Sequence, residues 1–271
     1  MPTIRLPEGA IDVIETGTGR PLILLHSLLA DRSIFDRVVP KLARTRRVVC
    51  PDLPGFGGSS AAGASISAIA DRVALLFDAL DLPRETDVLG NGFGGFVAST
   101  LAIRHGRRFD RLVLADTGLG FDEPGRAAFH GMAGRVRAGG MDAVIDIAMR
   151  RLFPDNFLAA NPAILAERRA ALVKTDPTLF ALACEALAAL DLTSEIGGIR
   201  NPTLVLVGAL DAATPPPMSH ALAAAIDGAR LVELPGLGHA PMAQDPDAFL
   251  AAISDFLGLE PAGAEPQRVT A

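Results

Sequence analysis

Near the carboxyl end of the chain, an aspartate and a histidine each follow an apolar run of strand length. Asp211 comes shortly after the run Thr203–Val207, and His239 ends the glycine-rich segment Leu234-Pro-Gly-Leu-Gly-His239, which follows the run Arg230–Glu233. A carboxylate bound to one imidazole nitrogen orients the ring and stabilises its protonated form, which leaves the second nitrogen to act as a base. We therefore predict that Asp211 and His239 are the acid and base of a catalytic site, although a single loop histidine is usually incidental.

A glycine cluster, Gly90-Asn-Gly-Phe-Gly-Gly95, lies between a strand-like run that ends at Leu89 and a helical pattern. A nucleophile elbow has the form G-x-S-x-G, in which a sharp turn from strand to helix exposes the serine at its apex. Gly90 and Gly94 match the flanking glycines of this form, and Gly92 stands at the apex. Glycine has no side chain, so nucleophilic attack from position 92 is impossible. A glycine-rich turn without any chemistry is the alternative interpretation.

The loop after the run Leu22–His26 is the predicted oxyanion loop. Its residues His26, Ser27 and Leu28 lie where a hydrolytic site presents a backbone N–H to the negative oxygen that develops during attack on a carbonyl. We expect the N–H groups of Leu28 and Phe93 to form this oxyanion hole, because Phe93 follows the apex of the elbow. His26 is expected to brace the loop, and the side chain of Ser27 is expected to point away from the elbow.

Three hypotheses account for a glycine at position 92. In the first, it is an engineered replacement of a catalytic serine. In the second, it is native, and His239 activates a water in place of the serine, since binding and oxyanion stabilisation alone retain roughly 10³–10⁴-fold catalysis. The same base would equally serve a cofactor-free lyase, isomerase or oxygenase. In the third, the protein binds a small molecule without catalysis. Candidate replacement hydroxyls are those of Ser27, Ser59, Ser60 and Thr117.

The same glycine cluster also matches G-x-G-x-x-G, the fingerprint of a dinucleotide-binding strand–helix unit. Asp116, 21 residues after Gly95, would then bind the ribose. This fingerprint normally occupies the first such unit of a domain, whereas several strand-like runs precede the cluster here, and it gives Asp211 and His239 no role. We therefore favour the elbow and predict no cofactor. Asp116 is expected to cap a strand or to substitute for the acid.

Short apolar runs alternate with helical patterns along most of the chain, which is typical of strand–helix–strand units and a parallel sheet. The eight predicted strands are Ile4–Leu6, Ile11–Glu15, Leu22–His26, Arg47–Cys50, Asp87–Leu89, Arg111–Ala115, Thr203–Val207 and Arg230–Glu233. The first two are expected to form an antiparallel hairpin. The predicted helices are Ile34–Leu42, Ser65–Leu80, Phe93–Arg104, Ser219–Ile226 and Asp245–Phe256. The candidate site residues follow strand ends, where parallel sheets form their sites.

The stretch 118–195 breaks this alternation, because its pattern is helical and it contains no strand-like run. We predict that residues 118–195 form a helical cap inserted in a core made of residues 1–117 and 196–257, and that residues 258–271 form a disordered tail. An extra core layer is the alternative for the insertion. The predicted substrate pocket includes His26, Ser27, Asn91, Phe129 and Phe153. Candidate ligands for a substrate carboxylate are Arg126, Arg150, Arg151, Arg168 and Arg169.

Composition limits the classes of protein to consider. The chain has 271 residues, of which 49% are hydrophobic, enough for a large core in a single α/β unit. A net charge of −6 without a Lys/Arg cluster disfavours nucleic-acid binding. No run is long enough to cross a bilayer, and Met1–Ala10 lacks the apolar core of a secretory signal. With Cys50 and Cys184 expected to be buried free thiols, we predict a cytoplasmic monomer or homodimer that acts on a small molecule and has no metal site.

At these segments the sequence resembles the α/β-hydrolase family over residues 1 to about 257. The loop His26-Ser-Leu28 is similar to that of the 3-oxoadipate enol-lactonases, and the elbow is similar to that of the meta-cleavage-product hydrolases; both groups have serine at the apex. The resemblance implies an eight-stranded, mostly parallel sheet flanked by helices, with a helical cap. It also implies a hydrolase of a small, partly apolar ester, lactone or related carbonyl compound, with acid, base and oxyanion donors at Asp211, His239, Leu28 and Phe93.

Overall fold

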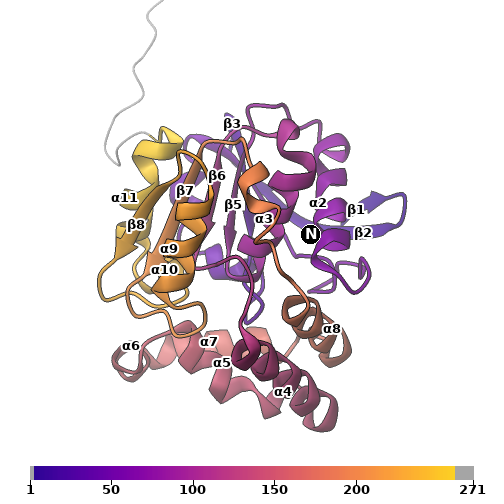
Figure 1. The fold of residues 1–271 in the computed structure, drawn as a ribbon, viewed down its shortest axis with the longest axis vertical. Helices are drawn as coiled ribbons and strands as arrows, with labels where there is room; N and C mark the ends of the chain where they lie inside the picture. The colour runs from indigo at the N-terminus through magenta and orange to yellow at the C-terminus, as the bar shows by residue number, and fades with distance from the viewer. Residues whose placement is uncertain (1–2, 260–271) are drawn as a thin grey trace, which may run out of the picture.

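Eight strands form one sheet in the computed structural model, which describes residues 3–259 (Figure 1). The strands are β1 (Thr3–Leu6), β2 (Gly9–Thr16), β3 (Arg20–Leu25), β4 (Arg46–Pro51), β5 (Asp87–Asn91), β6 (Leu112–Ala115), β7 (Thr203–Gly208) and β8 (Arg230–Leu234). Their order is β1-β2-β4-β3-β5-β6-β7-β8; β2 is antiparallel to its two neighbours, and the other pairs are parallel. The predicted fold class, α/β with an eight-stranded, mostly parallel sheet, is confirmed.

The central strands are apolar along their whole length because both of their faces are covered. Every residue of β5, β6 and β7 is buried. The β1–β2 hairpin lies at the edge of the sheet, and its residues alternate between more and less exposed positions. It turns between Leu6 and Gly9, and the antiparallel hairpin predicted from the sequence is confirmed.

Helices pack against the sheet on both faces. They are α1 (Val39–Leu42), α2 (Ile66–Ala79), α3 (Phe93–His105), α9 (Pro216–Ala225), α10 (Pro241–Gln244) and α11 (Pro246–Leu257). The predicted helix Ile34–Leu42 is wrong: the chain forms a 3₁₀ turn, Arg32–Phe35, and then the single turn of α1. Pro40 explains the break, because within a continuous helix its ring would clash with the carbonyl of Asp36. The other predicted helices agree with the structure to within a few residues.

Five helices fill the stretch between β6 and β7. They are α4 (Glu123–Gly139), α5 (Ile145–Leu152), α6 (Asp155–Ala160), α7 (Pro162–Leu172) and α8 (Pro177–Ala188). These helices gather at one end of the sheet, at the bottom of Figure 1. A bridge between Gly120 and Asp191 brings the two ends of the stretch side by side. The stretch therefore leaves the sheet and returns to it at nearly the same place.

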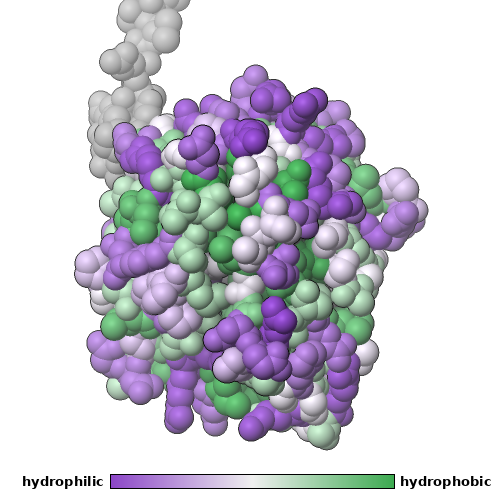
Figure 2. Space-filling model, viewed as in Figure 1, coloured by the Kyte–Doolittle hydropathy of each residue, from purple (hydrophilic) through white to green (hydrophobic). Residues whose placement is uncertain are grey.

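The chain beyond the last strand ends in α11. Gly258 ends this helix, and the N–H of Leu259 donates to the carbonyl of Ser254. The rest of the predicted tail, residues 260–271, lies outside the described residues. Hydrophilic and hydrophobic residues are interspersed over the face seen in Figure 2, and hydrophilic ones predominate over the lower part, where α4–α7 lie. No helix within residues 3–259 is both long enough and apolar enough to cross a membrane.

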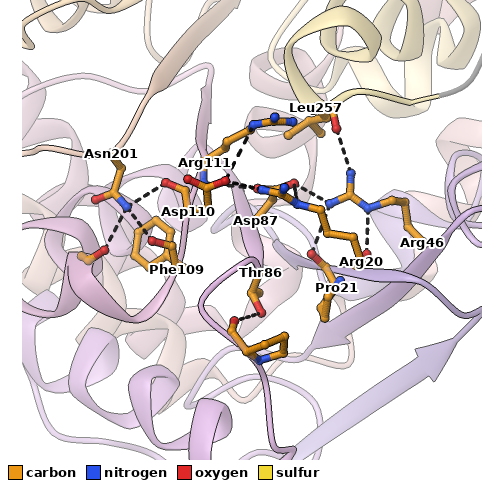
Figure 3. A network of polar contacts seen from close by, with 12 residues as sticks. Arg20, Pro21, Arg46, Thr86, Asp87, Phe109, Asp110, Arg111, Asn201 and Leu257 are labelled. Atoms are coloured by element: carbon orange, nitrogen blue, oxygen red, sulfur yellow. Dashed lines mark hydrogen bonds and ion pairs between the residues drawn. The ribbon is translucent and has the colours of Figure 1, made fainter.

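A buried ion-pair network joins the strands at the edge of the sheet where the parallel strands begin (Figure 3). Asp87, the first residue of β5, is fully buried and accepts hydrogen bonds from the guanidinium groups of Arg20 and Arg46, which open β3 and β4. Arg46 is also buried, and it donates to the carbonyls of Arg20, Pro21 and Leu257. Burial lowers the pKa of Arg46, and the Asp87 carboxylate opposes this change. The ion pair between Arg46 and Asp87 thus links β3, β4 and β5 to the end of α11.

We predict that Asp87→Asn lowers the free energy of unfolding by about 3–5 kcal/mol, because it leaves the buried charge of Arg46 without its counter-ion. Urea denaturation followed by far-UV circular dichroism measures the change. Asp247→Asn is the control, because Asp247 forms an exposed ion pair with Lys41, and such pairs contribute about 1 kcal/mol or less. Equal effects of the two substitutions contradict the role given to the network.

Candidate active site

The acid–base pair predicted from the sequence forms one buried contact. Asp211 follows β7 and His239 follows β8, and these strands are parallel neighbours, so their loops meet at one edge of the sheet. Oδ2 of Asp211 lies 2.9 Å from Nδ1 of His239, and both side chains are almost fully buried. Because an ionised carboxylate only accepts hydrogen bonds, Nδ1 is the donor in this contact, and in the neutral ring Nε2 then carries the lone pair. The imidazole is therefore in the tautomer that a general base requires.

Two backbone N–H groups hold the Asp211 carboxylate, and a hydroxyl lies beside it. The N–H groups of Ala213 and Thr214 donate to Oδ1 at 2.7 and 3.1 Å. The Thr214 hydroxyl lies 2.8 Å from Oδ2, 3.3 Å from Nδ1 of His239 and 2.7 Å from the carbonyl oxygen of Asp116 at the end of β6. Sequence reasoning missed Thr214. Its signal is the spacing in Asp211-Ala-Ala-Thr214, since an aspartate readily accepts from N–H groups two and three residues further on.

The side chain of Ser27 points into this site, so the prediction that it points away is wrong. Its Oγ lies 3.0 Å from Nε2 of His239. Ser27 is buried, and it lines a cavity together with Gly92 and His239. The empty space at position 92 is the reason, because a Cβ built on Gly92 would lie only 2.6 Å from Oγ of Ser27 and 2.5 Å from Nε2 of His239. Ser27, His239 and Asp211 form one continuous series of hydrogen bonds.

The glycine cluster turns sharply from β5 into α3. Gly92 has φ +54° and ψ −115°, and a positive φ strains a residue that carries a Cβ. Gly94 serves a different purpose, since a Cβ there would lie 2.1 Å from the carbonyl oxygen of Leu25 in β3. The segment thus has the backbone geometry of an elbow, with a glycine at the strained position.

His26 braces the loop that carries Ser27. Its Nδ1 lies 2.9 Å from the carbonyl oxygen of Ser27, and its Nε2 accepts a hydrogen bond from the N–H of Leu53 at 2.9 Å. Burial lowers the pKa of His26, which favours the neutral ring that these two contacts need. A peptide bond is planar and trans, so the N–H of Leu28 points away from the carbonyl that His26 holds.

Two backbone N–H groups remain available beside Ser27 and His239. The N–H of Leu28 has no hydrogen-bond partner within residues 3–259. Phe93 is the first residue of α3, and an N–H at that position has no acceptor in its own helix. Both residues line the same cavity as Ser27, so the two donors are suited to bind one negative oxygen there.

Asn91 and Asp116 lie behind the site, and both are fully buried. Nδ2 of Asn91 donates to Asp116 at 3.1 Å and to the carbonyl of His239 at 2.9 Å, so Asn91 positions the histidine loop. The N–H of Gly208 donates to the other Asp116 oxygen at 2.8 Å. Burial, and then the neighbouring charge of Asp211, raise the pKa of Asp116 well above its usual range. These contacts leave the carboxyl no access to a ribose, so the dinucleotide-binding alternative is not supported.

A cavity of about 30 Å³ lies over Ser27 and His239. Strand-end loops form one wall, and the helices between β6 and β7 form the other. Most of its lining is apolar, with side chains from Leu28, Leu29, Phe93, Phe96, Phe121, Phe129, Met132 and Leu187. Phe129 therefore lies where the sequence placed it. His26, Asn91 and Phe153 do not line the cavity, contrary to the prediction: the first two are buried beneath the loops, and Phe153 stacks on Phe157 with ring centroids 5.1 Å apart.

Arg151 is the one of the five candidate arginines that lines the cavity. Arg150 is exposed, and the other three bind carbonyl or carboxylate groups of their own helical stretch: Arg126, Arg168 and Arg169. Arg151 thus adds a positive charge to a mainly apolar wall.

The two cysteines are buried free thiols, as the sequence predicted. Burial raises the pKa of Cys50 and of Cys184 to about 12. Both thiols therefore stay protonated at neutral pH, and neither is suited to act as a nucleophile.

An elbow after β5, an acid after β7 and a base after β8 follow one another in the order that is typical of an α/β-hydrolase. The model of the alpha/beta hydrolase family matches residues 22–252, and the chain belongs to this family. The family predicted from the sequence is therefore confirmed.

Known members that resemble the chain are named as esterases and lactonases. A pimeloyl-(acyl-carrier protein) methyl ester esterase from Aeromonas hydrophila is 30% identical over 92% of this chain and 100% of its own length. A 3-oxoadipate enol-lactonase from Acinetobacter baylyi is 29% identical over 71% of this chain and 72% of its own. The crystal structure of an enol-lactonase from Burkholderia xenovorans covers 95% of this chain and 100% of that one at 31% identity, with a TM-score of 0.89.

We predict that Gly92→Ala lowers the free energy of unfolding by about 1–3 kcal/mol, because it places a Cβ in a turn with positive φ, and the side chains of Ser27 and His239 must also shift to admit it. Gly131→Ala is the control, since Gly131 is an exposed glycine of α4 whose added Cβ would meet nothing within 4 Å. This control is expected to raise the free energy of unfolding by about 0.5–1 kcal/mol. Urea titrations of both variants measure the changes, and an unchanged stability of Gly92→Ala refutes the steric argument.

A second prediction concerns Asp116. Its raised pKa means that the folded state keeps this proton at pH values where the unfolded chain, with a pKa of about 3.9, has lost it. The folded state then binds more protons, so this group makes the protein less stable as pH rises from about 4 through the folded pKa. Asp116→Asn removes this pH-dependent loss of stability. The variant is therefore expected to become more stable relative to wild type as pH rises.

Urea midpoints measured from about pH 4.5 to about pH 7.5 test this dependence. Asp227→Asn, at an exposed carboxylate, is the control and is expected to follow the wild-type curve. Parallel curves for Asp116→Asn and wild type show that Asp116 is ionised in the folded protein, against the expectation.

Proposed function

We propose that this chain hydrolyses small, partly apolar esters or lactones, with Asp211 and His239 as its acid and base. The observation that carries the proposal is the pair of contacts at one buried imidazole: Nδ1 lies 2.9 Å from the carboxylate of Asp211, and Nε2 lies 3.0 Å from the hydroxyl of Ser27. The similarity to an esterase and to two enol-lactonases supports the same class of substrate.

In this reaction His239 removes a proton from the O–H group that attacks the substrate carbonyl. Asp211 stabilises the imidazolium that results. The carbonyl oxygen gains negative charge and accepts hydrogen bonds from the N–H groups of Leu28 and Phe93, which are fixed in place before the reaction and shielded from water. His239 then returns its proton to the departing alkoxide, so the leaving group departs as an alcohol.

The cavity supports a small substrate with an apolar part. Its aromatic and aliphatic lining suits an acyl chain, and Arg151 is placed to attract a negative group on the same molecule. The cavity volume of about 30 Å³ is small beside the roughly 300–1,000 Å³ of typical ligand pockets. We therefore propose that α4, α5 and α8 move to admit the substrate, and that residues 118–195 act as a cap.

We predict that the protein hydrolyses p-nitrophenyl acetate and small lactones, and that His239→Ala lowers kcat/KM by about 10²–10⁴-fold because the general base is lost. Release of p-nitrophenolate measures the first reaction and proton release in weak buffer measures the second. His220→Ala is the matched control, since His220 is exposed and paired with Glu233. It is expected to keep wild-type activity.

Three outcomes oppose the proposal. Equal rates for wild type and His239→Ala show that the measured hydrolysis does not use this site. No hydrolysis by the wild type, together with saturable binding of a small apolar acid to the cavity, favours a binding protein. Activity that depends on His239 but gives no hydrolysis product favours another reaction of the same base, such as proton abstraction from carbon.

A further inference from the structure

The hydroxyl of Ser27 occupies the place beside His239 that a side chain on the elbow would fill. Its Oγ is 3.0 Å from Nε2 of His239 and 2.6 Å from the point where a Cβ on Gly92 would lie. We propose that Ser27 is the nucleophile of this site, so that the attacking hydroxyl comes from the loop after β3 and not from the elbow. This inference rests on the proposed function, because it names the group that attacks the ester.

The protonation pattern around His239 suits a serine that attacks. Nδ1 gives its proton to Asp211, so Nε2 is left to accept the hydrogen bond from the Ser27 hydroxyl. A hydroxyl directed at a base that a third group orients is the general form of an activated nucleophile. Nε2 has a single lone pair, so a water reaches it only after the Ser27 hydroxyl has turned away. The direct contact therefore favours Ser27 over water as the attacking group.

Ser27 also stands in the required relation to the two oxyanion donors. In an elbow, one donor is the N–H of the residue after the nucleophile, and the other comes from a neighbouring loop. Leu28 follows Ser27, and Phe93 opens α3 just after the neighbouring strand, since β3 and β5 are adjacent and parallel. The nucleophile thus lies on the loop after β3 instead of the turn after β5. The N–H groups of Leu28 and Phe93 still face the cavity.

The reaction proceeds through an ester of Ser27. His239 takes the hydroxyl proton while Oγ bonds to the substrate carbonyl carbon, and the oxyanion binds the N–H groups of Leu28 and Phe93. The C–O bond to the leaving group then breaks, and the alkoxide receives the proton from Nε2. In the second half, water gives a proton to Nε2 and bonds to the acyl carbon. The bond to Oγ breaks, Oγ recovers the proton, and the free acid leaves.

A phosphonate ester tests the identity of the nucleophile directly. A p-nitrophenyl alkylphosphonate transfers its phosphonyl group to an activated serine and releases p-nitrophenolate. Wild-type protein is expected to gain the mass of a single phosphonyl group, located on Ser27 by peptide mapping, and Ser27→Ala is expected to gain none. The chain has no tyrosine, which removes one common competing site. Ser254→Ala is the control, because the Ser254 hydroxyl binds a carbonyl within α11, and it is expected to be labelled at Ser27.

Kinetics provide the second test. Ser27→Ala is expected to lower kcat for p-nitrophenyl acetate by roughly 10³-fold or more, as loss of a nucleophile does. Wild type is expected to release a rapid burst of p-nitrophenolate before steady turnover, because acylation precedes deacylation. Ser27→Cys keeps a nucleophile at the same position, and it is expected to retain the burst with slower turnover. Circular dichroism melting curves for all variants show whether each one is folded.

The outcomes separate this inference from the proposed function. If wild type hydrolyses esters and a folded Ser27→Ala or Ser27→Cys variant does so without a burst and at a wild-type rate, water attacks and Ser27 is not the nucleophile. A phosphonyl group found on another residue also overturns the inference. If wild type neither hydrolyses esters nor reacts with the phosphonate, both the inference and the proposed function fail. Labelling of Ser27 without turnover supports the nucleophile and rejects the hydrolase.

Discussion

The hydrogen bond between Asp211 and His239 is the contact on which the rest of the site depends. It places the proton of the neutral ring on Nδ1, so that Nε2 is the nitrogen left to accept a hydrogen bond. Several segments maintain it: Thr214 holds the carboxylate, and Asn91 holds the backbone of the histidine loop. The raised pKa of Asp116 favours a neutral carboxyl next to Asp211. A single buried negative charge, and not two, then faces the imidazole, which avoids a large electrostatic cost.

The second constraint is one of volume. The loops after β3 and β5 approach the imidazole from adjacent strands, and with Ser27 and His239 in their present positions a side chain on residue 92 would collide with both. Glycine at position 92 leaves that space to Ser27. The glycine also removes the strain that a serine would carry at φ +54°. The carboxylate of Asp211 is held by the N–H groups of Ala213 and Thr214, which belong to neither of these two loops.

The sequence predicted the features that depend on local pattern. Apolar runs of strand length located all eight strands, and the positions of Asp211 and His239 after two of them placed both residues at one edge of the sheet. The direction of the Ser27 side chain was not predictable in this way, because it depends on the space left by a residue 65 positions later in the chain. The cavity lining from α4, α5 and α8 depends on tertiary packing, which helical periodicity does not specify. Pro40 is different, since its effect on the helix predicted at 34–42 follows from the sequence alone.

The close approach between positions 27 and 92 has a consequence for how such a protein changes over generations. Substitutions at two sites in contact do not act independently. Serine introduced at position 92 alone would crowd the hydroxyl already present, and loss of Ser27 alone would leave neither loop with a hydroxyl. The effect of a substitution at one of the two positions therefore depends on the residue at the other.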